Sequence, residues 1–180
     1  MLGKKEISGG SGILAQRIAR KAECAVCFIT EQVNLDLQKI LVPIDFSAHS
    51  LRALKTALHL KEQSKEINIT ALHLIDVPMT AYKINRNKAE IIRRMKESAE
   101  QSFRHFLTQN HLSESQLDFK MRLNDDFDVS RYIKKIALSE KSDLIITGAK
   151  GRSGLSGFVF GSVTENLIST KDTPSVLVVR

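Results

Sequence analysis

The chain of 180 residues contains no tryptophan, three prolines and two cysteines, and only 6% of its residues are aromatic. It has no apolar run of the roughly 20 residues that a membrane-spanning helix needs, and its N-terminus lacks the apolar core of a signal peptide. We therefore expect a cytoplasmic protein without a membrane partner. The hydrophobic fraction of 42% is sufficient for a folded core, which argues against disorder.

The two cysteines form a single C-x-x-C pair, Cys24 and Cys27. A zinc site usually needs four ligands, and the sequence has no second pair. A redox pair normally lies at a helix start, whereas this pair begins a predicted strand. The pattern favours two buried, unreactive thiols.

The net charge of +7 is compatible with any anionic partner. The basic residues are scattered along the chain, however, and no aromatic residues are interleaved with them. We therefore predict solvated helix faces and no nucleic-acid partner.

Hydrophobic periodicity predicts an alternation of strands and helices from Lys39 onward. The predicted strands are 39–45, 69–75, 117–123, 143–147 and 175–179, and helices separate them. This order predicts an α/β fold with a doubly wound open parallel sheet, helices on both faces and the strand order 3-2-1-4-5. The strand 117–123 alternates strictly and is predicted at a half-exposed edge. Before Lys39, we predict a helix at 13–22, a strand at 25–29 and a linker at 30–38.

A glycine-rich loop follows the fourth of these strands, in the segment LIITGAKGRSGLSGFVFGSVTE. Gly148 and Gly151 are followed after nine residues by Gly161 and Ser162, and the S-x-x-E spacing of Ser162 predicts a capping box at a helix start. Backbone N–H groups at such a junction suit an anion. Lys150 and Arg152 add positive charge. The alternative is a plain tight connection.

The strand order places a second segment, Pro43-Ile44-Asp45, beside this loop at the switch point of the sheet. Asp45 could accept hydrogen bonds from ribose hydroxyls or from the amine of a base. Alternatively, Asp45 caps the following helix. His73 lies mid-strand and is predicted to be a packed core histidine.

Five motifs, ILVPIDFS, LHLID, DLIITGAKGRSG, GSVTENLI and SVLVV, resemble those of the universal stress protein family over residues 39–180. The resemblance implies an adenine nucleotide alpha hydrolase-like fold, a cofactor that is ATP, ADP or AMP, with Mg²⁺ as a candidate companion, and dimerisation through the last strand. The segment Asn124-Asp125-Asp126, outside the phosphate loop, departs from the glycine, often with a proline, that many relatives carry there. The nucleotide-binding residues implied are Pro43, Asp45, Leu74, Gly148, Gly151, Arg152, Gly161, Ser162, Val163 and Thr164.

The N-terminal segment repeats the end of the chain in outline, since the glycines and serines of residues 3–12 match those of 148–157 at one offset. We interpret residues 1–29 as the remnant of a preceding stress-protein domain, in a chain that is either a fragment or a natural truncation. Glu6 stands where Gly151 stands, so this copy is predicted not to bind phosphate. We expect its strand to pair with 175–179, in the same chain or in a partner.

The sequence contains no legible catalytic set, so we expect a regulatory, nucleotide-binding stress protein with slow ATP hydrolysis at most. A nucleotide-free dimerisation or interaction module of the same fold is the main alternative. An ATP-pyrophosphatase is a weaker one, because Gly12 replaces the aspartate of its S-G-G-x-D-S loop. A phosphoacceptor receiver would need paired acids after the first strand, where Asp45 stands alone.

Overall fold

The computed structural model describes residues 2–4, 11–30, 36–77, 88–124, 128–151, 160–169 and 173–180. The strands are β1 (Leu2–Lys4), β2 (Val26–Thr30), β3 (Lys39–Pro43), β4 (Asn68–Asp76), β5 (Asp118–Asn124), β6 (Leu144–Gly148) and β7 (Ser175–Val179). The helices are α1 (Ser11–Lys21), α2 (Ala48–Gln63), α4 (Lys88–Gln109), α5 (Val129–Ser139) and α6 (Ser162–Ser169), with a 3₁₀ turn at Glu114–Gln116. None of the helices in these ranges combines the length and hydropathy that a bilayer span requires.

The strands form one sheet in the order β1-β2-β7-β6-β3-β4-β5. From β3 onward every pairing is parallel, and the order of these five strands is the predicted 3-2-1-4-5. The strand β5 lies at the edge, as its alternating pattern predicts. The predicted α/β fold is therefore confirmed, and the structure adds β1 and β2 beyond β7.

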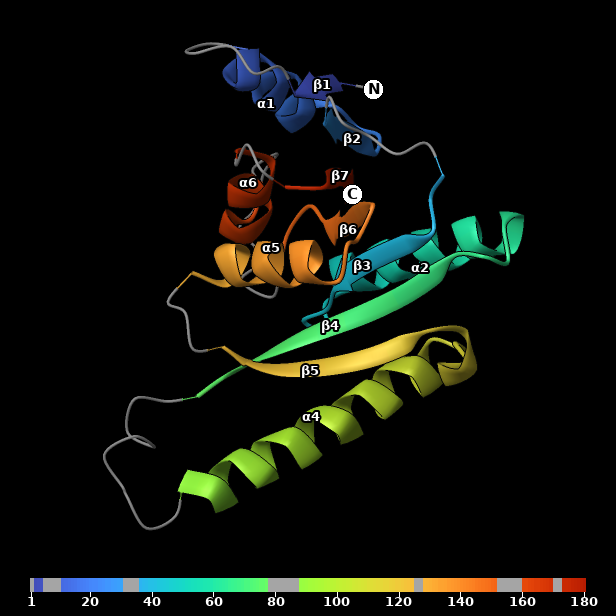
Figure 1. Cartoon of the computed structure of the whole chain (residues 1–180), viewed down its shortest axis with the longest axis vertical. Helices are drawn as coiled ribbons and strands as arrows, with labels where there is room; N and C mark the ends of the chain where they lie inside the picture. Colours follow the sequence, from blue (N-terminus) through green and yellow to red (C-terminus); the bar gives the residue numbers. More distant parts are fainter. Residues whose placement is uncertain are drawn as a thin grey trace.

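Two apolar layers lie on opposite faces of the sheet, because successive side chains of a strand point to opposite faces. On one face, Ile40 and Val42 of β3 pack with α2 and α4. On the other face, Leu41 packs in a cluster that includes residues of α1, α5 and α6. Figure 1 shows α2 and α4 on one side of the sheet and α5 and α6 on the other.

The helix α2 begins where a serine caps it. The Ser47 hydroxyl accepts a hydrogen bond from the Ser50 amide at 3.2 Å, so Ser47 is the N-cap and Asp45 is not. Leu54 and Leu58 recur on one helix face and are buried against the sheet. Burial of each such leucine stabilises the fold by about 1.5–3 kcal/mol.

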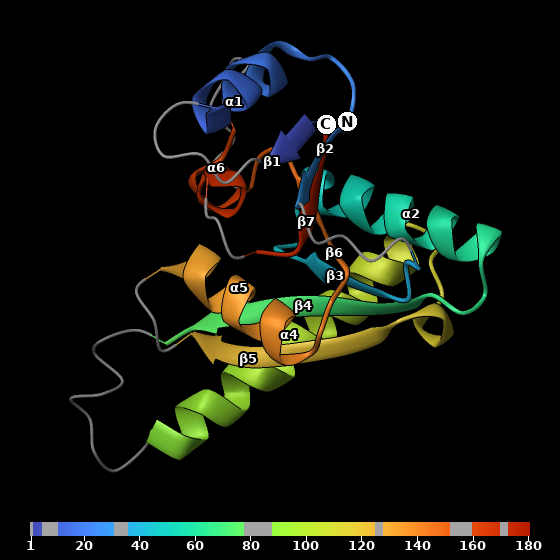
Figure 2. The same ribbon diagram turned by 45° about the horizontal axis from the view of Figure 1, so that its top comes forward.

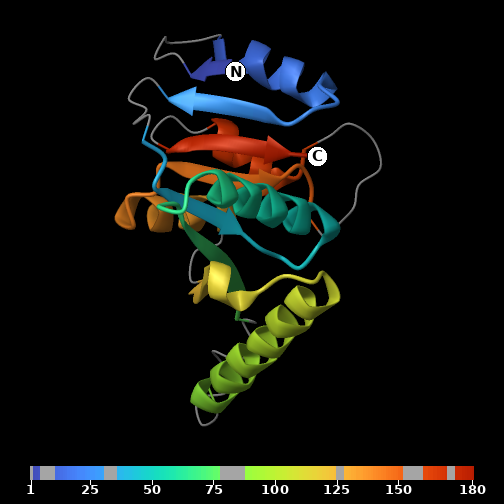
Figure 3. The same ribbon diagram turned by 90° about the vertical axis from the view of Figure 1, so that its right-hand side faces the viewer.

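The N-terminal segment joins the sheet in the same chain. β2 pairs antiparallel with β7, and β1 pairs parallel with β2. Figure 3 shows β2 alongside β7, and Figure 2 shows α1 next to α6. The predicted pairing of the N-terminal strand with 175–179 is thus present within one chain.

The prediction of two buried thiols is wrong for Cys24, which is exposed because it lies in the connection between α1 and β2, before the strand begins. Cys27 lies within β2 and is half-buried. No disulfide joins the two cysteines, so hydrogen bonds and packing hold the segment.

Candidate functional site

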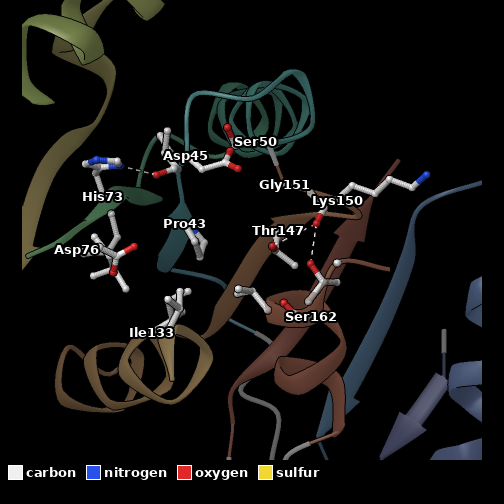
Figure 4. A pocket seen from close by; sticks show the side chains of 18 residues that line it. Pro43, Asp45, Ser50, His73, Asp76, Ile133, Thr147, Lys150, Gly151 and Ser162 are labelled. Carbon is white, nitrogen blue, oxygen red and sulfur yellow. Dashed lines mark hydrogen bonds between the residues drawn. The ribbon is translucent and has the colours of Figure 1, made fainter. Parts of the chain in front are cut away.

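A pocket of about 270 Å³ opens at the carboxyl ends of β3, β4 and β6. β3 lies between β4 and β6. The chain adds β4 and β5 on one side of β3 and then β6 and β7 on the other, so the strand order reverses at β3 and this is the switch point of the sheet. The lining comes from these strand ends, from the start of α6 and from α5 (Figure 4). The position is the one at which open α/β sheets bind ligands.

The structure brings nearly all of the predicted site residues together around this pocket. Those that line it are Pro43, Asp45, Leu74, Gly148, Gly151, Gly161, Ser162, Val163 and Thr164. Arg152 lies outside the described residues. Sequence reasoning missed the lining residues Ser50, Asp76, Val129, Ile133 and Thr147. Asp76 could have been found from its place at the end of the LHLID motif, directly after the strand.

The glycines of the motif have different roles, and two of the three allow close packing of the protein itself. A Cβ added to Gly148 would lie 2.6 Å from the carbonyl carbon of His49, so the start of α2 excludes any side chain there. A Cβ on Gly151 would lie 2.9 Å from a carboxylate oxygen of Asp45. At Gly161 the nearest atoms are at 3.5 Å, which is ordinary contact. Close packing against the start of α2 is therefore one structural reason for a glycine at position 148.

The helix α6 starts at the predicted place, but its predicted capping box is absent. Ser162 is its first residue, and the carboxylate of Glu165 pairs with the guanidinium of Arg20 in α1 instead of turning back to the helix start. The Thr164 hydroxyl donates to the Gly148 carbonyl oxygen at 2.8 Å, so it is committed to the fold. The amides of the first turn of α6 remain for an anion, because first-turn N–H groups have no partner within the helix.

The opposite end of the pocket is apolar, with Leu74 from β4 and Val129 and Ile133 from α5. Ile133 is fully buried, whereas Leu74 and Val129 are half-buried. His73 also lines the pocket, is half-buried, and hydrogen-bonds the Ile44 carbonyl oxygen through Nδ1 at 2.8 Å. Its ring lies 4.5 Å from that of Phe46, so it packs as predicted while bordering the site.

The charges around the pocket are mixed. The Asp45 carboxylate accepts from the Ser47 amide at 3.0 Å and lies next to Gly151. Figure 4 shows the Lys150 side chain directed away from the pocket. Burial lowers the pKa of His49, and Arg52 and then Lys150 lower it further, while Asp45 raises it. Within the described residues, no group of three His, Cys, Asp or Glu side chains is placed to hold a metal ion.

The comparisons with known proteins agree with this geometry. The model of the universal stress protein family matches residues 36–180. The chain belongs to the universal stress protein family. It is 27% identical over 157 residues to the universal stress protein MJ0577 of Methanocaldococcus jannaschii, a match that covers 79% of this chain and 95% of the relative.

Solved structures of stress proteins share the fold. The structure of MJ0577 matches with a TM-score of 0.63 at 31% identity and covers 79% of this chain and 95% of its own. UspA from Lactobacillus plantarum matches with a TM-score of 0.62 at 23% identity, covering 82% of this chain and all of its own. A stress protein from Archaeoglobus fulgidus matches with a TM-score of 0.61 at 17% identity, covering 98% of this chain but 57% of its own.

Proposed function

We propose that the pocket binds an adenine nucleotide, that is ATP, ADP or AMP, and that the protein acts as a nucleotide-binding regulator. The phosphates lie at the Gly148–Gly151 loop and the first turn of α6, and the base lies against Leu74 and Ile133. Asp45, whose carboxylate lies next to Gly151, accepts from the ribose hydroxyls. The observation that carries this proposal is the convergence of the predicted residues on one pocket at the switch point.

The helix start and the apolar end suit the two parts of a nucleotide separately. A positive helix terminus with unpaired amides favours phosphate. Half-buried aliphatic side chains favour a flat base, because its burial removes apolar surface from water. Mg²⁺ would enter with the phosphates of ATP rather than through a preformed protein site. No catalytic set is legible in the sequence, so slow hydrolysis at most is part of the proposal.

The direct test is to denature the purified protein and to identify the released small molecules by mass spectrometry. Calorimetry with ATP, ADP and AMP, each with and without Mg²⁺, then gives the preference. Gly161→Glu should abolish binding, because it puts a carboxylate beside the phosphates. Gly161→Ala is the matched control, since its Cβ meets only ordinary contacts. A folded wild-type protein that binds none of the three would favour the nucleotide-free interaction module.

We also propose that residues 1–29 are the C-terminal remnant of a preceding stress-protein domain, followed by a linker at 30–38 and the domain at 39–180. The strand pairing supports this reading. Gly3 lies opposite Ile29 as Gly148 lies opposite Val179, which are the equivalences of the sequence repeat. Urea unfolding of the full chain and of residues 36–180 tests this division: residues 36–180 should fold cooperatively without the N-terminal segment, and a truncated chain that fails to fold would contradict it.

A further inference from the structure

Two polar residues end neighbouring strands at the base side of the pocket. Asp76 is the last residue of β4 and Asn124 is the last residue of β5, and they lie directly opposite each other in the parallel register. Asp76 is exposed and lines the pocket. Figure 4 shows it across Pro43 from Gly151 and Ser162, above Ile133.

Asn124 holds this carboxylate in place. Its Nδ2 donates to Asp76 Oδ1 at 2.7 Å, and the direction of this bond is fixed because an ionised carboxylate can only accept. The Asn124 Oδ1 is buried and has no hydrogen-bond partner among the described residues. That arrangement costs stability, and a glycine here would avoid it. The side chain therefore serves to position Asp76, whose Oδ2 is not engaged by Asn124.

The distance from the phosphate end suits a nucleoside that carries phosphates. β3 alone separates β4 from β6, and neighbouring strands lie about 4.8 Å apart. Asp76 also lies three residues beyond His73, the β4 residue level with Gly148, so the two strand ends are about 14 Å apart. The Asp76 carboxylate disfavours phosphate at this end of the pocket, whereas the N-terminus of α6 favours phosphate at the other end. The base is thus directed to the Asp76 side, with its ring against Leu74 and Ile133.

We propose that Asp76, positioned by Asn124, accepts a hydrogen bond from the exocyclic amino group of the base and so selects an amino-bearing purine such as adenine. This inference rests on the proposed function, since it assigns a role within the same pocket. Asp76 contacts the ligand, and Asn124 acts through Asp76. The amino group is the chemical feature that is read, so a purine without it should bind less tightly.

The test compares ATP with purine riboside 5′-triphosphate, which has the same ring system and phosphates but no amino group, by calorimetry. The wild-type protein should bind ATP about tenfold more tightly, as expected for a hydrogen bond to a charged acceptor. Asp76→Ala should weaken ATP about tenfold, leave purine riboside triphosphate nearly unchanged and bring the affinity ratio near one. Asn124→Gly should lower the ratio partly, because the carboxylate is kept but no longer held.

Each other outcome counts against a defined part of the proposal. Equal affinity of the wild-type protein for both nucleotides would overturn the selection by Asp76 and leave the proposed function standing. Equal weakening of both ligands by Asp76→Ala would show a structural role and also overturn it. An unchanged ratio in Asn124→Gly would remove Asn124 from the mechanism. A wild-type protein that binds neither nucleotide would overturn the proposed function itself. The Gly161→Glu variant, which should bind no nucleotide, gives the calorimetric baseline for that comparison.

Discussion

Cys27 lies directly opposite Leu177 at the midpoint of the antiparallel ladder between β2 and β7. The flanking pairs are symmetric about it: Val26 faces Val178, and Phe28 faces Val176. When strand 25–29 is aligned with strand 175–179, Val26, Cys27 and Phe28 correspond to Val176, Leu177 and Val178. β2 therefore pairs with β7 in the register that a second, identical β7 strand would adopt across a two-fold axis. The N-terminal segment thus covers the β7 edge in the same way that β7 of a second copy of the chain would cover it.

Removal of this cover should change the oligomeric state. A protein of residues 36–180 exposes the β7 edge, whose N–H and C=O groups then pair with β7 of another copy. We expect this truncated chain to sediment as a dimer and the full chain to sediment as a monomer. The measurement is analytical ultracentrifugation at matched concentrations.

Leu177→Lys in the truncated chain is the matched control for that experiment. In the symmetric register, Leu177 faces its own copy, so two like charges would lie opposite each other and weaken the pairing. The variant should be monomeric. Identical oligomeric states for the full and truncated chains would contradict the edge-covering role of β2.

Arg180 fastens α1 to the end of β7. Its guanidinium donates to the carbonyl oxygens of Ala19 and Arg20, each at 2.8 Å, and lies 5.5 Å from the centre of the Phe160 ring. Arg180→Ala should lower the local free energy of opening of α1 and β2 by about 1–3 kcal/mol, since hydrogen bonds from a charged group are lost. Hydrogen exchange of the β2 amides measures this change.

The comparison variant is Arg17→Ala, which removes an exposed arginine of α1. It should leave β2 protection within about 0.5 kcal/mol of the wild type. If both variants lost the same amount of hydrogen-exchange protection in β2, the net charge of the protein, rather than the Arg180 contacts, would hold α1 and β2 in place.

Patterns within single elements predicted most of this fold. The periodicity of apolar residues, and with it the order of strands and helices, can be read from residues that are close in the sequence. The strand order followed from right-handed crossovers. The misses depend on contacts between distant segments. Glu165 fits a local capping box, yet Arg20 of α1 takes its carboxylate. Thr164 looks available to a ligand, yet it donates to Gly148. Neither partner can be read from the spacing of the motif.

Gly148 and Gly161 look alike in the motif and should differ in their response to a methyl group. Gly148→Ala places a Cβ 2.6 Å from the backbone of His49, so the start of α2 must shift. We expect a loss of about 1–3 kcal/mol in the free energy of unfolding, as for other over-packed sites. Gly161→Ala should cost less than about 1 kcal/mol. Urea unfolding of both variants measures the difference, and equal losses would contradict the assigned packing role of Gly148.

His49 should report on both the fold and the site through its pKa. Burial and the cations Arg52 and Lys150 hold this pKa below its ordinary value of 6.5. The unfolded chain therefore binds a proton more readily than the native one. The contribution of His49 to stability is fully present above pH 6.5 and is lost as the pH falls from there toward the folded pKa.

A bound nucleotide should raise the pKa of His49, because phosphate charge beside the Gly148–Gly151 loop favours the imidazolium. NMR titration of the ring protons, with and without ATP, measures this shift, and His49→Gln assigns the signal. Arg52→Gln should raise the pKa in the free protein, since it removes a nearby positive charge. A His49 pKa that stays unchanged in saturating ATP would place the phosphates away from the start of α2 and would contradict the proposed orientation of the nucleotide.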